Sequence, residues 1–99
     1  MITVKHAAGD QWQVTVQAGV ATEHRVRVSK ADLERFAPGR SPEELLRESF
    51  GFLLEREPNT SILSSFDIPV INRYFPEFEK EIRQRLARRN PTAPGCRKS

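Results

Sequence analysis

Hydrophobic and polar residues alternate in three short stretches of the first third of the chain. Within Gln11–Gln17 the apolar residues are Trp12, Val14 and Val16, and Ile2–His6 and His24–Ser29 show the same period of two. A period of two places the apolar side chains on one face of a strand. The AAGD segment marks a turn between the first two strands, and Ala18–Glu23, which contains Gly19, marks a second turn. We therefore expect a three-stranded antiparallel meander whose apolar face needs a helix to cover it.

The period becomes helical in Ser41–Glu57, the longest amphipathic stretch of the chain. Ser41 and Glu44 have the spacing of a capping box, and Pro42 suits the first helical position. At about 100° per residue, one set of side chains covers an arc of about 200°. This set comprises Leu45, Leu46, Ser49, Phe50, Phe52, Leu53 and Leu54. So wide an apolar face predicts a central helix that other elements cover on more than one side, and Pro58 ends it.

Shorter helices are predicted on both sides of the central one. Ser29 and Asp32 indicate a cap for a helix over Lys30–Phe36. Thr60 or Ser61 can begin one helical turn bearing Ile62, Leu63 and Phe66, and Asp67 can cap another helix that runs to Tyr74. Pro76 opens a last helix, whose apolar residues form only a narrow stripe, as in a helix on the surface: Phe78, Ile82 and Leu86.

The predicted fold class is therefore α+β. A small N-terminal antiparallel meander of three strands is covered by the central helix, and short C-terminal helices complete a single core. Residues 1–90 form this one domain, and residues 91–99, PTAPGCRKS, are expected to be a disordered basic tail.

The net charge of +3 is unevenly distributed. Residues 1–81 carry 10 basic and 13 acidic side chains, whereas residues 82–99 carry six basic side chains and no acidic one. A generally basic body that binds nucleic acid is therefore not indicated. The C-terminal arginines are either solvated or able to attract an acidic partner, a protein or a nucleic acid; the candidates are Arg83, Arg85, Arg88 and Arg89.

The sequence contains no recognisable catalytic or metal-binding motif. His6, His24 and Cys96 fit no known metal-ligand spacing, and there is no glycine-rich phosphate loop or nucleophile motif. A single cysteine favours a reducing compartment, and the chain shows neither a signal peptide nor an apolar run long enough to span a membrane. We predict a cytoplasmic binding protein without enzymatic activity, cofactor, membrane role or evident small-molecule substrate, which acts through a protein partner or self-association.

The order of strand, short helix, turn and helix over His24–Glu57 resembles the ribbon-helix-helix repressors. In that family the strand pairs with its mate in a dimer and enters the major groove of DNA. The resemblance implies that Arg25, Arg27 and Ser29 face base edges, and that the Ser41 end of the central helix meets a phosphate. A dimeric DNA-binding regulator or antitoxin is accordingly the alternative function.

Two further segments, SFGFLLEREPNTSIL and FDIPVINRYFPEFEKEI, resemble a set of short bacterial proteins of unassigned function. The shared pattern is Ser-Phe-x-Phe-Leu-Leu-Glu-Arg-Glu-Pro, then Phe-Asp and Tyr-Phe-Pro-Glu, and the resemblance extends from about Trp12 to Ile82. It implies a bacterial single-domain protein whose C-terminal half belongs to the fold. It implies no activity and no functional residues.

The aromatic residues of the C-terminal half have two interpretations. Phe66, Tyr74, Phe75 and Phe78 lie among aliphatic residues such as Ile68 and Val70. We interpret them as core residues rather than as a binding groove, with the Tyr74 hydroxyl at the rim of the core.

Overall fold

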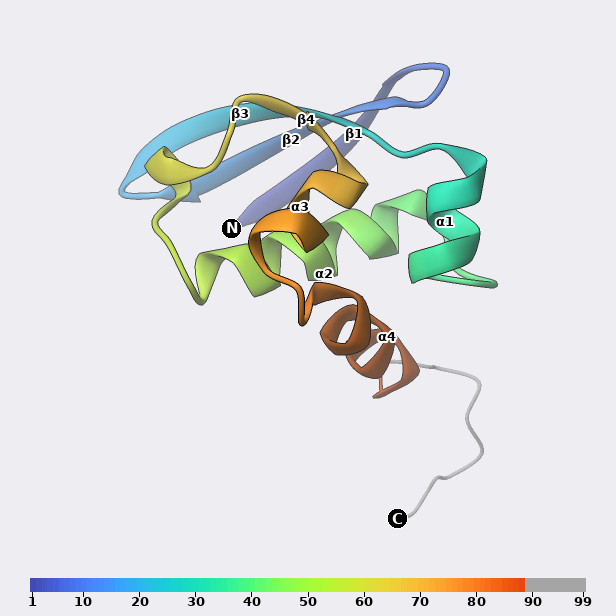
Figure 1. The fold of residues 1–99 in the computed structure, drawn as a ribbon. Helices are drawn as coiled ribbons and strands as arrows, with labels where there is room; N and C mark the ends of the chain where they lie inside the picture. The colour runs from blue at the N-terminus through green and yellow to red at the C-terminus, as the bar shows by residue number, and fades with distance from the viewer. Residues whose placement is uncertain (89–99) are drawn as a thin grey trace.

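The computed structural model describes residues 1–88 as a layered α+β fold (Figure 1). The sheet has the order β1-β2-β3-β4, and its strands are β1 (Ile2–Ala8), β2 (Gln11–Ala18), β3 (Val20–Arg27) and β4 (Ser65–Asp67). The first three strands are antiparallel, and β4 is parallel to β3. The predicted fold class and the N-terminal meander are thus confirmed.

Along the chain, α1 (Lys30–Phe36) and α2 (Pro42–Leu54) follow β3. A 3₁₀ turn, η1 (Asn59–Ser61), then leads into β4, and α3 (Ile68–Tyr74) and α4 (Phe78–Arg88) follow β4. Both predicted capping boxes form. The Ser29 hydroxyl accepts from the Asp32 N–H at 3.1 Å, and the Ser41 hydroxyl accepts from the Glu44 N–H at 3.2 Å. Asp67 stands at the N-cap of α3, but its side chain makes no capping hydrogen bond.

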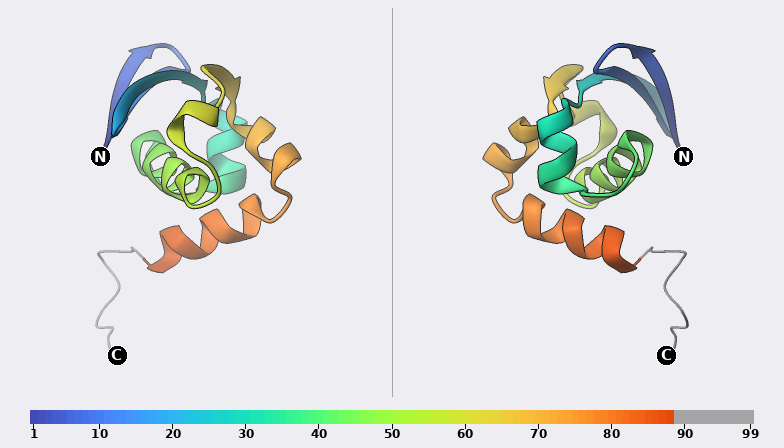
Figure 2. Two further views of the ribbon diagram at one scale, coloured as in Figure 1. Left: turned by 90° about the vertical axis from the view of Figure 1, so that its left-hand side faces the viewer. Right: turned by 90° about the vertical axis from the view of Figure 1, so that its right-hand side faces the viewer.

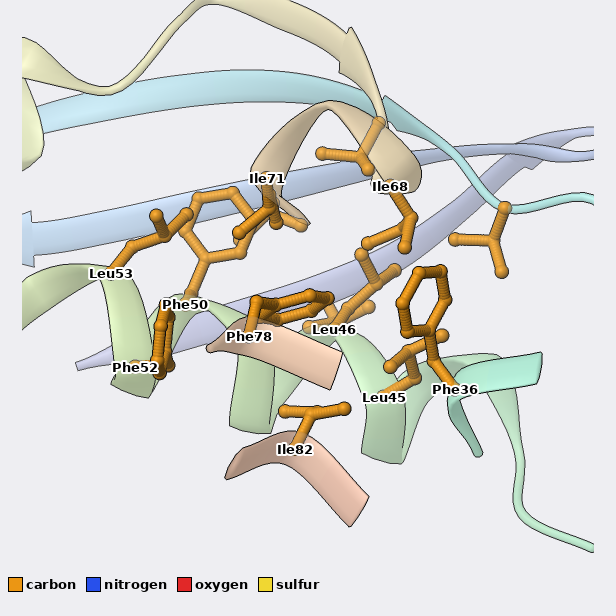
Figure 3. Packing of buried hydrophobic residues seen from close by; sticks show 14 of the residues in the cluster. Phe36, Leu45, Leu46, Phe50, Phe52, Leu53, Ile68, Ile71, Phe78 and Ile82 are labelled. Atoms are coloured by element: carbon orange, nitrogen blue, oxygen red, sulfur yellow. The ribbon is translucent and has the colours of Figure 1, made fainter. Parts of the chain in front are cut away.

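Helix α2 lies between the sheet and α4, while α1 and α3 both lie on one side of it (Figures 1 and 2). Its apolar arc is buried from Leu45 to Leu53, as the wide face predicts. Phe50 contacts the sheet through His24 and Phe66, whereas Phe52 contacts Phe78 of α4 with ring centroids 5.3 Å apart (Figure 3). The predicted central helix is therefore covered on both faces by its own chain.

Helix α4 buries its narrow stripe completely. Phe78 and Ile82 are 0% exposed and Leu86 is 3% exposed. The surface location predicted for this helix is correct only for its polar face, because the apolar stripe forms the second layer against α2 (Figure 3).

Two element boundaries differ from the prediction for local reasons. Strand β3 begins at Val20 rather than His24, because Gly19 at φ 83° reverses the chain in a tighter turn than expected. Helix α2 ends at Leu54 rather than Glu57, because the N–H groups of Glu55 and Arg56 bond back three residues, to Phe52 O and Leu53 O. Such bonds tighten the last turn of a helix.

The helical turn predicted from Thr60 or Ser61 through Phe66 is wrong. Only Asn59–Ser61 is helical, and Phe66 lies in β4, paired with Val26 of β3. The partner that makes Ser65–Asp67 a strand lies about 40 residues earlier in the chain, so the local pattern carries no signal for it.

Candidate functional site

No described helix covers the outer face of the sheet (Figure 1). The burial pattern of β3 places Arg25 and Arg27 on this face. Both are exposed, whereas His24 and Val26, which alternate with them along β3, point into the core. Over these residues β3 is paired with β2 on one edge and with β4 on the other. The strand therefore has no free edge for the intermolecular ribbon that the repressor resemblance implies.

Ser29 and Ser41 act as helix caps in the structure. Each hydroxyl accepts from the N–H of the third residue in its helix, and the Asp32 and Glu44 carboxylates accept in return from the cap N–H groups. Local helix chemistry accounts for both residues.

The C-terminal arginines that the structure describes hold α4 in place. Arg85 binds Glu55 Oε1 at 2.6 Å, which ties α4 to the end of α2, and Arg83 Nε donates to the carbonyl of Arg35 in α1 at 3.0 Å. The hydrogen bond from Arg85 lowers the pKa of Glu55, and the same bond raises the pKa of Arg85. These two arginines serve the fold, while the Arg88 side chain and Arg89 lie outside the described part of the chain, as do Cys96 and the predicted tail.

Arg40 provides a further link to α4. Its guanidinium donates to the carbonyl of Leu86 at 2.7 Å and forms an ion pair with Glu44 at 3.3 Å. One side chain in the α1–α2 connection thus satisfies a carbonyl near the end of α4 and strengthens the start of α2.

A pocket of about 380 Å³ lies where the end of α2, the segment 59–63, β4 and α3 meet. Its lining is mostly aliphatic and aromatic: Leu53, Glu57, Ser61, Ile62, Leu63, Phe66, Val70, Ile71, Tyr74 and Phe75. The volume falls within the range of about 300–1,000 Å³ that is typical of ligand pockets. We call this set of residues the apolar pocket.

A chain of partly buried hydrogen bonds holds one wall of the apolar pocket. Asn59 Nδ2 donates to Val20 O at 2.7 Å and to Thr22 Oγ1 at 2.9 Å, and Thr22 Oγ1 lies 2.9 Å from His24 Nε2. His24 Nδ1 lies 2.8 Å from the carbonyl of Leu63, which can only accept, so Nδ1 carries the proton. In the neutral ring Nε2 then accepts from the Thr22 hydroxyl. These bonds fix the segment 59–63 to β3 and so place Leu63 at the rim.

Two large apolar side chains at this rim are exposed to solvent. Leu63 is 47% exposed and Tyr74 is 66% exposed. The other large apolar side chains exposed in residues 1–88 are Met1 and Val20, which do not line the pocket. Solvent-exposed apolar side chains that surround a pocket are typical of interaction sites.

Comparison with known protein families, with curated proteins and with solved structures finds no match. Both sequence resemblances therefore stay predictions, and the function has to be argued from the site itself.

No group of three metal-ligating side chains occurs within residues 1–88, and none of the helices described there has the length and apolar character needed to cross a membrane. Among the described residues, no hydrogen bond joins the polar side chains of the pocket, Glu57, Ser61 and Tyr74. A nucleophile paired with a base is thus not present in the pocket.

The sequence interpretation missed this pocket. Phe66, Phe75 and Phe78 were expected in the core, and Phe66 and Phe78 are indeed buried, yet Phe66 and Phe75 also line the pocket together with Tyr74. The one usable signal was Tyr74, because tyrosine commonly keeps its hydroxyl in water beside an apolar surface.

Proposed function

We propose that this protein is a non-catalytic binding domain whose apolar pocket receives an apolar side chain of a partner protein. The observation that carries the proposal is the pairing of a 380 Å³ apolar pocket with the exposed Leu63 and Tyr74 at its rim.

The exposure of the rim favours a protein over a small ligand. A ligand that filled only the pocket would leave the outer surfaces of Leu63 and Tyr74 in water. A protein surface can fill the pocket with one anchor side chain and cover the rim at the same time. Anchors of this kind, often aromatic and seated in desolvated pockets, supply most of the binding free energy of protein interfaces.

A site-specific photo-cross-linker tests the proposal. We expect a cross-linking residue at position 63 to give a defined protein adduct in cells, and one at position 3, where Thr3 is exposed on the outer face of the sheet, to give none. Once the partner is purified, Leu63→Asp and Tyr74→Ala should each weaken binding about tenfold or more, as expected for anchor residues. The matched control is Thr3→Asp. Equal adducts from both positions, or an affinity that neither pocket variant changes, would refute the proposal.

A further inference from the structure

Among the described residues, Glu57 is the one charged residue in the lining of the apolar pocket. It is half-buried, and its carboxylate makes no ion pair or hydrogen bond with any other residue in the described part of the chain. The neighbouring Glu55 differs, because Arg85 lies 2.6 Å and Arg56 3.6 Å from the Glu55 carboxylate. Within residues 1–88, one carboxylate at the end of α2 is thus neutralised and the other lies beside the pocket without a counterion.

The end of α2 makes the surroundings of Glu57 more negative. The Glu57 N–H donates to the carbonyl of Leu53 at 2.9 Å, which places this residue at the C-terminal end of the helix, where the macrodipole is negative. The last turn of α2 contains no basic residue that would offset it.

Arg56, the adjacent cation, makes its contacts with other residues. Its guanidinium lies 3.7 Å from the centroid of the Phe52 ring, and its Nε donates to Glu77 at 3.2 Å. Within residues 1–88 neither Arg56 nor any other cation pairs with the Glu57 carboxylate, so a partner could supply its counterion.

From these observations we infer that the partner segment carries a lysine or arginine next to the apolar side chain that enters the pocket, and that this cation pairs with Glu57. The inference rests on the proposed function and specifies the chemistry of the partner. A half-buried carboxylate gains most from a counterion when binding removes water from around it. Residues 89–99 are basic but include no Leu, Ile, Val, Met, Phe, Tyr or Trp, so a segment of another protein suits the pocket better than this chain's own tail.

Selection from a random peptide library tests the inference. We expect peptides selected on the wild-type protein to share Leu, Phe or Trp with a Lys or Arg close by. Selection on Glu57→Gln should keep the apolar residue and lose the basic one. Glu43→Gln removes an exposed carboxylate near the start of α2 and serves as the matched control, which should select the same peptides as the wild type.

Calorimetry with one selected peptide then measures the charge preference. Replacing its basic residue by norleucine should weaken binding to the wild type about three- to tenfold, the range of a partly exposed ion pair, and should leave binding to Glu57→Gln nearly unchanged. The same loss of affinity in both proteins would overturn the inference, as would selected peptides that are apolar but not basic; either result would leave the proposed function intact.

Other occupants give distinct results. If Leu63→Asp selects the same peptides as the wild type, the pocket is not the docking site, and the inference and the proposed function both fail. If no peptides are selected, and light scattering shows a dimer that the Leu63→Asp substitution dissociates, the occupant is a second copy of the chain. That result would overturn the inference. If the selection yields no peptides, and NMR shows that the pocket binds n-octylammonium but not n-octanoate, the pocket is assigned to a small amine. That result would also overturn the inference.

Discussion

Asn59 joins the strand β3 to the wall of the apolar pocket, and replacing it by alanine tests the importance of that connection. The side chain is 4% exposed, and its amide nitrogen donates both to Val20 O and to Thr22 Oγ1. Asn59→Ala removes both of these hydrogen bonds. The hydrogen bonds that join Thr22 to His24 and His24 to Leu63 then lose their link to Asn59.

The expected loss follows from these two hydrogen bonds. A buried hydrogen bond contributes about 1 kcal/mol net, so the pair contributes about 2 kcal/mol. Val20 is itself exposed, and water can reach its carbonyl once the amide is gone, which argues against a much larger loss. The free energy of unfolding of a protein is typically about 5–15 kcal/mol, so a loss of this size is easily measured.

Urea unfolding followed by the fluorescence of Trp12, the single tryptophan, provides the measurement. With a denaturant slope of about 1–2 kcal/mol per molar, the midpoint should fall by about 1–2 M. Thr60→Ala is the matched control, because Thr60 lies in the same 3₁₀ turn and is exposed. A midpoint for Asn59→Ala that coincides with that of Thr60→Ala would refute the reasoning that this network stabilises the fold.

Three further predictions follow from the packing of α2 and α4. Glu55→Gln should destabilise the protein at neutral pH. Because the pKa of Glu55 is lowered in the folded protein, its carboxylate stabilises the folded state above the ordinary glutamate pKa, and this contribution is lost as the pH falls through the lowered folded value. The urea midpoints of variant and wild type should therefore converge at an acidic pH below that lowered value. A gap that persists there would show that packing, not charge, is responsible. Gly51→Ala should raise the free energy of unfolding by about 0.5–1 kcal/mol, since Gly51 is inside α2 and an added Cβ would meet only Arg85 Nη1, at 3.9 Å. Gly39→Ala should lower the free energy of unfolding by about 1 kcal/mol, because Gly39 has φ 78°. Thermal unfolding of both variants checks this pair, and a change of the same sign in both would contradict it. Phe78→Ala should lower the free energy of unfolding by about 3–5 kcal/mol, because the ring is fully buried between Phe36 and Phe52. Hydrogen exchange should show that the amides of α4 lose protection before those of the sheet. A uniform loss of protection across the chain would contradict a separable α4 layer.

Much of the fold was predictable because its signals are local. The capping boxes at Ser29 and Ser41 each involve residues three apart, and the apolar arc of α2 is contained within 13 residues. The period of two in the first strands required only that neighbouring strands be joined by short turns. In each case the physical cause and the residues that show it lie within one or two turns of chain.

The candidate site was not predictable in the same way. Nothing between Ile62 and Phe66 distinguishes a strand from a short helix until Arg25–Arg27 supplies the parallel partner. The roles of the arginines likewise depend on distant residues. The sequence alone predicts that Arg83 and Arg85 are solvated or contact a partner. Only the approach of α4 to α1 and α2 brings Arg83 to Arg35 O and Arg85 to Glu55.

The sequence by itself determined the α+β class, the capped helices and the place of Ser41–Glu57 at the centre of the core, because propensity, capping and hydrophobic period are encoded by neighbouring residues. The tertiary structure alone decided that β3 has both edges occupied over Arg25–Arg27, and that Leu63 and Tyr74 remain exposed beside a pocket. It also decided that Glu57 has no counterion among residues 1–88. Each of these features depends on which distant segments meet. Side chains near in sequence were separated, and side chains distant in sequence were brought together, by the burial of one continuous apolar surface.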